Sequence, residues 1–91
     1  MFNKLKQYKD LRSQAKTMQD ALGEETVTQE TRGVKITMDG NMKVKSVEIQ
    51  DNLDKKSIES ATTECFNEAV KKAQKKMAQK MKEMGGMPGM Q

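Results

Sequence analysis

Lysines are the residues of this chain whose type and spacing suggest chemistry. Toward the C-terminal end they follow one another closely, as Lys71, Lys72, Lys75, Lys76, Lys80 and Lys82. Residues four apart share one face of a helix, so Lys71 and Lys75, for example, would place like charges side by side. An array of phosphates would offset that repulsion. The alternative is a solvated helix surface near a C-terminus, where the helix dipole favours cations.

A second basic group lies at the N-terminal end. Its members are Lys4, Lys6, Lys9, Arg12 and Lys16, with Asp10 as the one acidic residue among residues 1–16. Residues 17–67, in contrast, contain six basic and ten acidic residues, although the whole chain has a net charge of +4. The positive charge therefore resides in the two end segments, which predicts that these segments bind a polyanion.

Two long helices are expected to carry these charges. Over residues 3–22, apolar residues recur at spacings of three and four, and Gly23 is placed to end the helix. Residues 55–84 form the second predicted helix, with Asp54 as its N-cap. Its predicted apolar stripe consists of Ile58, Ala61, Cys65, Ala69, Ala73, Met77, Met81 and Met84. Phe66 and Val70 broaden the first half of this stripe, so that half is expected to lie on a sheet.

Three strands are predicted between the helices. Residues 24–30 are rich in Thr and have Val27 as their one strong apolar residue, which is typical of a thinly covered strand. After a turn at residues 31–33, apolar residues alternate with polar ones from Val34, and Asp39-Gly40 predicts a hairpin with Gly40 at positive φ. The alternation then changes parity, which predicts a β-bulge near Lys45-Ser46.

The expected fold class is therefore α+β, with a three-stranded antiparallel sheet flanked by two long helices. Residues 1–84 are expected to be one domain and residues 85–91, GGMPGMQ, a flexible tail. The first helix runs toward the sheet and the second runs away from it. Packed antiparallel, they bring both basic segments together, which favours salt-sensitive phosphate binding with little sequence selectivity. Aromatic residues are not interleaved with the lysines, so stacking on single strands is not favoured.

Several other functions are disfavoured. The chain has no His and a single cysteine, Cys65, which is expected to be a core thiol. We therefore expect no enzyme, catalytic residue, metal site, cofactor or small-molecule substrate. The sequence has no apolar run of about 18 residues, so we expect a cytoplasmic protein without a membrane partner.

The methionines leave two alternatives open. Met77, Met81, Met84, Met87 and Met90 recur every three or four residues. Such a stripe could dock a partner helix, as in a protein-interaction adaptor. Thioethers also bind Cu(I), which would suit a copper chaperone. The simpler interpretation is that the first three methionines pack along the helix and the last two belong to the tail.

The content of apolar residues bears on assembly. Only 34% of the residues are apolar and 3% are aromatic, so one chain can bury little surface. Small domains of this kind commonly gain stability by association. We therefore expect a homodimer, with the central hairpin near its two-fold axis.

The order of these features resembles that of a known family. The most specific segments are the V-x-I-T-x-D-G-x-x-x-V-x-S-V-E-I run at residues 34–49 and FNEA at residues 66–69, and the chain ends near GGMPGM. Together they resemble the YbaB/EbfC family of bacterial nucleoid-associated proteins over essentially the whole chain. The resemblance implies a tweezers-like homodimer of αβββα protomers that coats or bends double-stranded DNA in the nucleoid, with weak or variable sequence preference, and that can influence gene expression.

Overall fold

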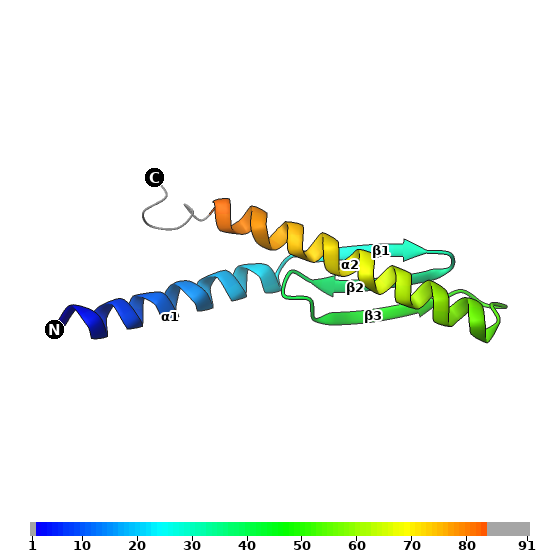
Figure 1. Ribbon diagram of the computed structural model, residues 1–91, viewed down its shortest axis with the longest axis horizontal. Helices are drawn as coiled ribbons and strands as arrows, with labels where there is room; N and C mark the ends of the chain where they lie inside the picture. The colour runs from blue at the N-terminus through cyan, green and yellow to red at the C-terminus, as the bar shows by residue number, and fades with distance from the viewer. Residues whose placement is uncertain (1, 84–91) are drawn as a thin grey trace.

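The computed structural model describes residues 2–83, with side chains from residue 9 onward. It contains five elements in the order α1 (Phe2–Gly23), β1 (Thr26–Thr31), β2 (Val34–Asp39), β3 (Val44–Ile49) and α2 (Lys55–Glu83). This order, which Figure 1 shows, confirms the predicted αβββα protomer. The expected tail at residues 85–91 lies outside the described residues.

The sheet is an antiparallel meander with the strand order β1-β2-β3. Thr37 pairs with Ser46, but the next residue, Met38, pairs with Val44. Lys45 is therefore an extra residue in β3, and the predicted bulge is confirmed. The bulge lets Val44 and Val47, which have opposite parity in the sequence, project from the same face of the sheet.

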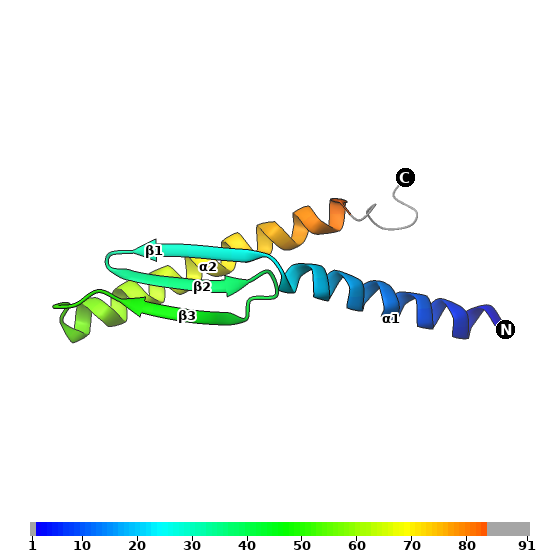
Figure 2. The ribbon, with the colours of Figure 1, turned by 180° about the vertical axis from the view of Figure 1, so that it is seen from behind.

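The core lies between α2 and one face of the sheet. It is formed by Val27, Val34, Ile36 and Met38 from the strands and by Ala61, Cys65, Ala69 and Ala73 from the helix. Figure 2 shows that neither α1 nor α2 covers the opposite face. The Cys65 thiol is fully buried and donates to the carbonyl oxygens of Gln29, at 3.1 Å, and Val34, at 3.3 Å. It is a core thiol, as predicted.

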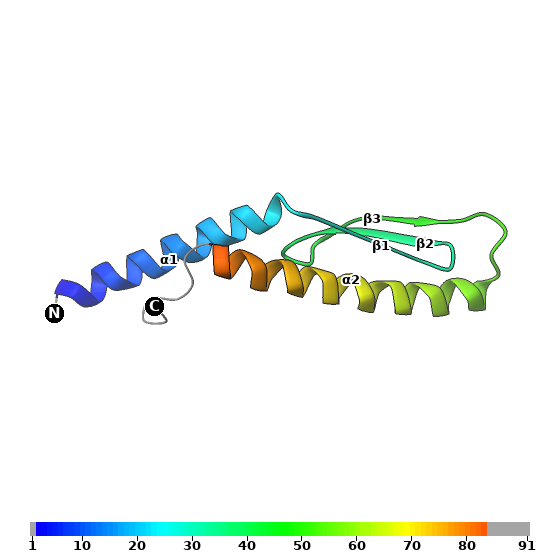
Figure 3. The same ribbon diagram turned by 90° about the horizontal axis from the view of Figure 1, so that it is seen from above.

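The apolar stripe of α2 is buried over a shorter length than predicted. Only its members from Ala61 to Ala73 are buried, whereas Met81 is 39% exposed and Phe66 is 41% exposed. Met84 lies outside the described residues. The reason is that α2 crosses β1 and β2 and then continues past the sheet, as Figure 3 shows. The methionines of that continuation have no sheet beneath them.

The start of α2 is capped as predicted. The carboxylate of Asp54 accepts a hydrogen bond from the backbone N–H of Ser57, at 2.7 Å. Hydrogen bonds from the side chain and backbone of Ser57 lower the pKa of Asp54 below its ordinary value. The carboxylate therefore remains ionised and satisfies a donor that the helix itself leaves unpaired.

The end of α1 is capped by the β2–β3 hairpin rather than by a left-handed glycine. The helix ends at Gly23, as predicted, but Gly23 is not among the residues with positive φ. Instead, the carbonyl oxygen of Leu22 accepts from Gly40 N at 2.8 Å and from Glu25 N at 3.1 Å. The side-chain amide of Asn41 donates to Gln19 O at 2.8 Å. The hairpin thereby fixes the base of α1.

Gly40 has a different role from the predicted one. The left-handed residue of this loop is Met42, with φ of 67°, and Gly40 does not have positive φ. A Cβ atom at position 40 would lie 2.7 Å from Leu22 O, which is too close for any side chain. Gly40 is therefore required by the close approach of the hairpin to α1.

Both helices extend from the same end of the sheet (Figures 1 and 3). α1 runs toward the sheet, α2 runs away from it, and the two contact one another. The predicted antiparallel arrangement is confirmed. Neither helix, over residues 2–83, has a stretch that is long and apolar enough to span a bilayer.

Candidate nucleic-acid interface

The six lysines near the end of α2 form two rows. Helical geometry of 3.6 residues per turn places residues separated by four, seven or eight on one side of the helix. Lys72, Lys76 and Lys80 form one such row, which we name the inner row. Lys71, Lys75 and Lys82 form the other, which we name the outer row.

The inner row is engaged in contacts within the chain. Lys72 Nζ donates to the carbonyl oxygen of Thr28 on β1, at 3.1 Å. Lys76 Nζ lies 3.8 Å from one carboxylate oxygen of Glu25, and Lys80 Nζ lies 3.1 Å from the other. Lys80 also lies 3.4 Å from a Glu83 oxygen. These contacts join α2 to β1 and to the residues that connect α1 with β1.

The ion pairs around Lys80 shift two pKa values in opposite directions. The hydrogen bond from Lys80, followed by the charges of Lys80 and Lys76, lowers the pKa of Glu25. Hydrogen bonds to Glu25 and Glu83 raise the pKa of Lys80. Glu25 and Lys80 therefore both stay charged at neutral pH, which is the state in which they attract one another.

The outer row is exposed and has few partners. Lys71 lies 3.6 Å from Glu68, but 68% of its side chain is exposed, so this pair is weak. Neither Lys75 nor Lys82 has an ion-pair partner among residues 9–83. Lys82 also lies in the last turn of α2, where the helix dipole favours a cation. Three ammonium groups are thus presented to solvent along one side of the helix.

The basic residues of α1 form a comparable row. Lys9, Arg12 and Lys16 are spaced by three and four, so they share one face of the helix, and all three are exposed. The backbone at Lys4 and Lys6 is helical, but their side chains lie outside the described residues. The structure therefore places both basic segments on helices that extend from the same end of the sheet.

A shallow groove connects the two rows of α2 with the sheet. It is lined by Thr26, Val27, Thr28, Lys72, Lys75, Lys76 and Gln79. Its walls contain three ammonium groups, two hydroxyls and one amide, with no carboxylate. This lining suits an anion with several oxygen acceptors, such as a backbone phosphate.

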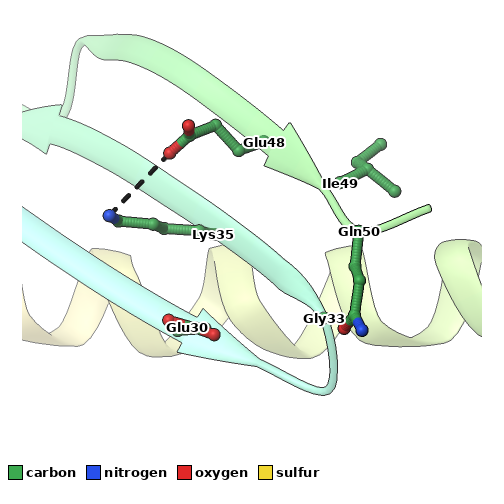
Figure 4. Close-up of a pocket in the computed structure, with 6 residues that line it drawn as sticks. All are labelled: Glu30, Gly33, Lys35, Glu48, Ile49 and Gln50. Atoms are coloured by element: carbon green, nitrogen blue, oxygen red, sulfur yellow. Dashed lines mark ion pairs between the residues drawn. The ribbon is translucent and has the colours of Figure 1, made fainter.

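A second hollow has different chemistry. It lies at the end of the sheet opposite to the end from which α1 and the C-terminal part of α2 extend. Figure 4 shows that it is lined by Glu30, Gly33, Lys35, Glu48, Ile49 and Gln50. Lys35 Nζ lies 3.8 Å from Glu48 Oε2. Two carboxylates therefore surround one ammonium group, so this hollow repels a polyanion.

Glu25 is the residue that sequence reasoning missed. It precedes Lys76 and Lys80 by more than 50 residues, so no local spacing connects them. The available signal was its place directly after the end of the first helix, because the last helix must return past that point.

A comparison of the chain with known protein families agrees with this fold and with its basic helices. The family described as the YbaB/EbfC DNA-binding family matches residues 1–88 of the 91 residues. The match includes both helices, the sheet and every basic residue of the two end segments. The chain therefore belongs to the YbaB/EbfC DNA-binding family and is a nucleoid-associated DNA-binding protein.

Proposed function

We propose that the protein binds double-stranded DNA through its backbone phosphates, using the basic residues of both helices. The candidate contacts are Lys4, Lys6, Lys9, Arg12, Lys16, Lys71, Lys72, Lys75, Lys76, Lys80 and Lys82. The observation that carries this proposal is the outer row, because Lys75 and Lys82 are exposed and have no ion-pair partner among residues 9–83. Ammonium groups in this state can release the counterions of DNA without first breaking an internal contact.

Recognition of this kind has weak sequence preference. Contacts to phosphate position a protein on the duplex but carry no direct sequence information. In the described part of both helices, the exposed basic groups are mainly lysines, which act as point charges rather than as bidentate readers of base edges. The protein would thus act in the nucleoid by changing DNA conformation, and it could influence gene expression in that way.

A homodimer is the assembly that we propose. Val44, Val47 and Ile49 of β3 pair with the buried residues Met38, Ile36 and Val34. They therefore project from the same sheet face as the core, yet each is 40–48% exposed because α2 packs on β1 and β2. A second copy of this chain would cover them. Phe66 of α2 is a further large apolar side chain that is 41% exposed in one chain.

Dimerisation through this surface would leave the outer row accessible. Phe66, Val70 and Met77 form an apolar row on α2, and each is followed five residues later by a member of the outer row. Five residues correspond to a rotation of about 140° around the helix axis. A partner that covers the apolar row would thus lie on nearly the opposite side of α2 from the outer row, and each protomer would present its own basic helices to DNA.

Binding to fluorescently labelled duplexes tests this function directly. Random and defined duplexes should bind with similar affinity, and binding should weaken steeply as the salt concentration rises. Salt-independent binding would contradict a phosphate-based interface and would favour apolar docking. A strong preference for one duplex would contradict the weak sequence selectivity.

A further inference from the structure

Glu25 is a carboxylate that two lysines of α2 share. It lies between the end of α1 and the start of β1, and 26% of its side chain is exposed. Figure 3 shows α2 passing this junction after it leaves the sheet. Both Glu25 carboxylate oxygens are used, one within 3.1 Å of Lys80 Nζ and one within 3.8 Å of Lys76 Nζ.

A carboxylate and a phosphate diester offer similar chemistry to an ammonium group. Each is an anion with two charged or partly charged oxygen acceptors, and each forms charge-assisted hydrogen bonds to lysine. An ammonium group that donates to Glu25 has fewer donors left for a phosphate. Of the six lysines near the end of α2, Lys76 and Lys80 therefore have Glu25 already in place as an internal anion.

We propose that Glu25 is an internal competitor of DNA, which holds Lys76 and Lys80 and thereby weakens duplex binding. This inference rests on the proposed function, since it assumes that the lysines of α2 contact phosphates. DNA must displace Glu25 to use Lys76 and Lys80, whereas Lys75 and Lys82 are available at once. Glu25 thus limits the affinity of the protein for DNA.

The purely structural alternative makes a different forecast. If Glu25 only braced α2 against the α1–β1 junction, its removal would loosen the helices and DNA binding would be unchanged or weaker. If Glu25 competes with phosphate, its removal should strengthen binding. The sign of the change in affinity therefore separates the two roles.

The test compares Glu25→Gln with Glu24→Gln on one labelled random duplex over a range of salt concentrations. Both variants gain one unit of positive charge, at neighbouring positions, but Glu24 has no ion pair within residues 9–83. We expect Glu25→Gln to bind about two- to fivefold more tightly than Glu24→Gln, the range that one exposed ion pair can supply. Its salt slope should steepen by up to about 0.9 for each lysine released.

Glu25→Asp keeps the inference testable if Glu25→Gln folds poorly, and a comparison of two lysine variants in both backgrounds adds a second test. Glu25→Asp retains the charge but retracts the carboxylate, so it should also bind more tightly than the wild type. Lys80→Gln should cost more affinity in the Glu25→Gln background than in the wild type. Lys72→Gln, which removes a lysine bound to Thr28 O rather than to Glu25, should cost the same in both backgrounds.

The possible outcomes are distinct. Equal or weaker binding by Glu25→Gln and Glu25→Asp, with salt-dependent binding of the wild type intact, would overturn the competitor role and leave the proposed function standing. Absence of salt-dependent binding by the wild type itself would overturn both.

Discussion

At the scale of single residues, two glycines near the base of α1 make a matched pair. Gly40 faces Leu22 O, and an added Cβ would lie 2.7 Å from it, whereas a Cβ at Gly23 would lie 3.8 Å from the nearest atom, Asn41 Nδ2. Gly40→Ala must therefore shift the hairpin away from α1, and we expect it to lower the free energy of unfolding by about 1–3 kcal/mol. Chemical denaturation followed by circular dichroism measures this change.

Gly23→Ala is the control for that prediction. Gly23 is the last residue of α1 and does not have positive φ, so alanine fits without strain. We expect an increase in stability of about 0.4–1 kcal/mol, because alanine restricts the unfolded chain. A loss of stability in Gly23→Ala equal to that in Gly40→Ala would show that the close approach at Leu22 O is not what selects glycine.

The N-cap of α2 provides a pH-dependent prediction. Hydrogen bonds from Ser57 lower the pKa of Asp54 in the folded state, so its contribution is fully present above the ordinary value of 3.8 and is lost as the pH falls below it. Asp54→Ala should lower the Tm at neutral pH, and its difference from the wild type should shrink below pH 3.8. Asp54→Ser keeps a capping oxygen that does not titrate, so it should preserve the helix without this acid dependence.

The same residues show how far sequence reasoning extends. Asp54 is recognisable as the N-cap because capping depends on local geometry, which sequence spacing encodes. Gly40 is recognisable as a necessary glycine, but for the wrong reason. The Asp-Gly pair suggests a positive φ, whereas the actual constraint is the carbonyl of Leu22, a contact between distant parts of the chain that no dipeptide rule contains.

At the scale of the elements, periodicity predicts all five of them. The bulge at Lys45 is predictable because the apolar residues of β3 change parity. One extra residue in the strand returns them to the same face of the sheet. The buried length of α2 is not predictable in the same way. The apolar stripe of a helix shows which side of the helix contacts the sheet. The point at which α2 leaves the sheet depends instead on the length of the strands beneath it. Met77 and Met81 consequently belong to the stripe and yet extend beyond the core.

The division of the α2 lysines leads to a prediction about DNA affinity. Changing Lys71, Lys75 and Lys82 to Gln preserves good helix formers and relieves like-charge repulsion between Lys71 and Lys75, so the fold should be maintained. Duplex binding should weaken on all sequences, and the salt slope should become shallower by about 0.9 for each phosphate that the variant no longer binds. Fluorescence anisotropy at several salt concentrations measures both quantities.

Two matched sets of variants test that assignment. Changing the inner row, Lys72, Lys76 and Lys80, removes the same charge but should cost less affinity, because Glu25 already neutralises part of it. Changing Lys43 and Lys45, at the β2–β3 hairpin, should cost least because they lie on the sheet rather than on the extended helices. If the hairpin lysines proved essential and the outer row dispensable, DNA would have to lie across the sheet.

At the scale of the whole molecule, a single chain leaves both helices thinly supported. Leu11 of α1 is 64% exposed, although it belongs to the predicted apolar stripe of that helix. The sequence indicates this shortage of core through its few apolar residues. It does not indicate where the uncovered surface lies, because that depends on α2 crossing β1 and β2 while leaving β3 open.

The proposed dimer can be tested at that surface with two adjacent residues of β3. Val47 pairs with Ile36 and projects from the sheet face that carries the core, whereas Ser46 pairs with Thr37 and projects from the opposite face. Both are exposed in one chain, so lysine at either position should be tolerated by a monomer. In a dimer that covers β3, Val47→Lys buries an unpaired charge and should shift the assembly toward monomer.

Light scattering at micromolar protein concentration distinguishes these cases. We expect the wild type and Ser46→Lys to have twice the mass of one chain, and Val47→Lys to approach the mass of one chain with its circular dichroism spectrum retained. Val47→Lys should also bind duplex DNA more weakly despite its added positive charge, because a monomer presents only one set of basic helices. A wild type with the mass of one chain would refute the dimer. A dimeric Val47→Lys would instead place the interface elsewhere and leave the apolar face of β3 without an assigned partner.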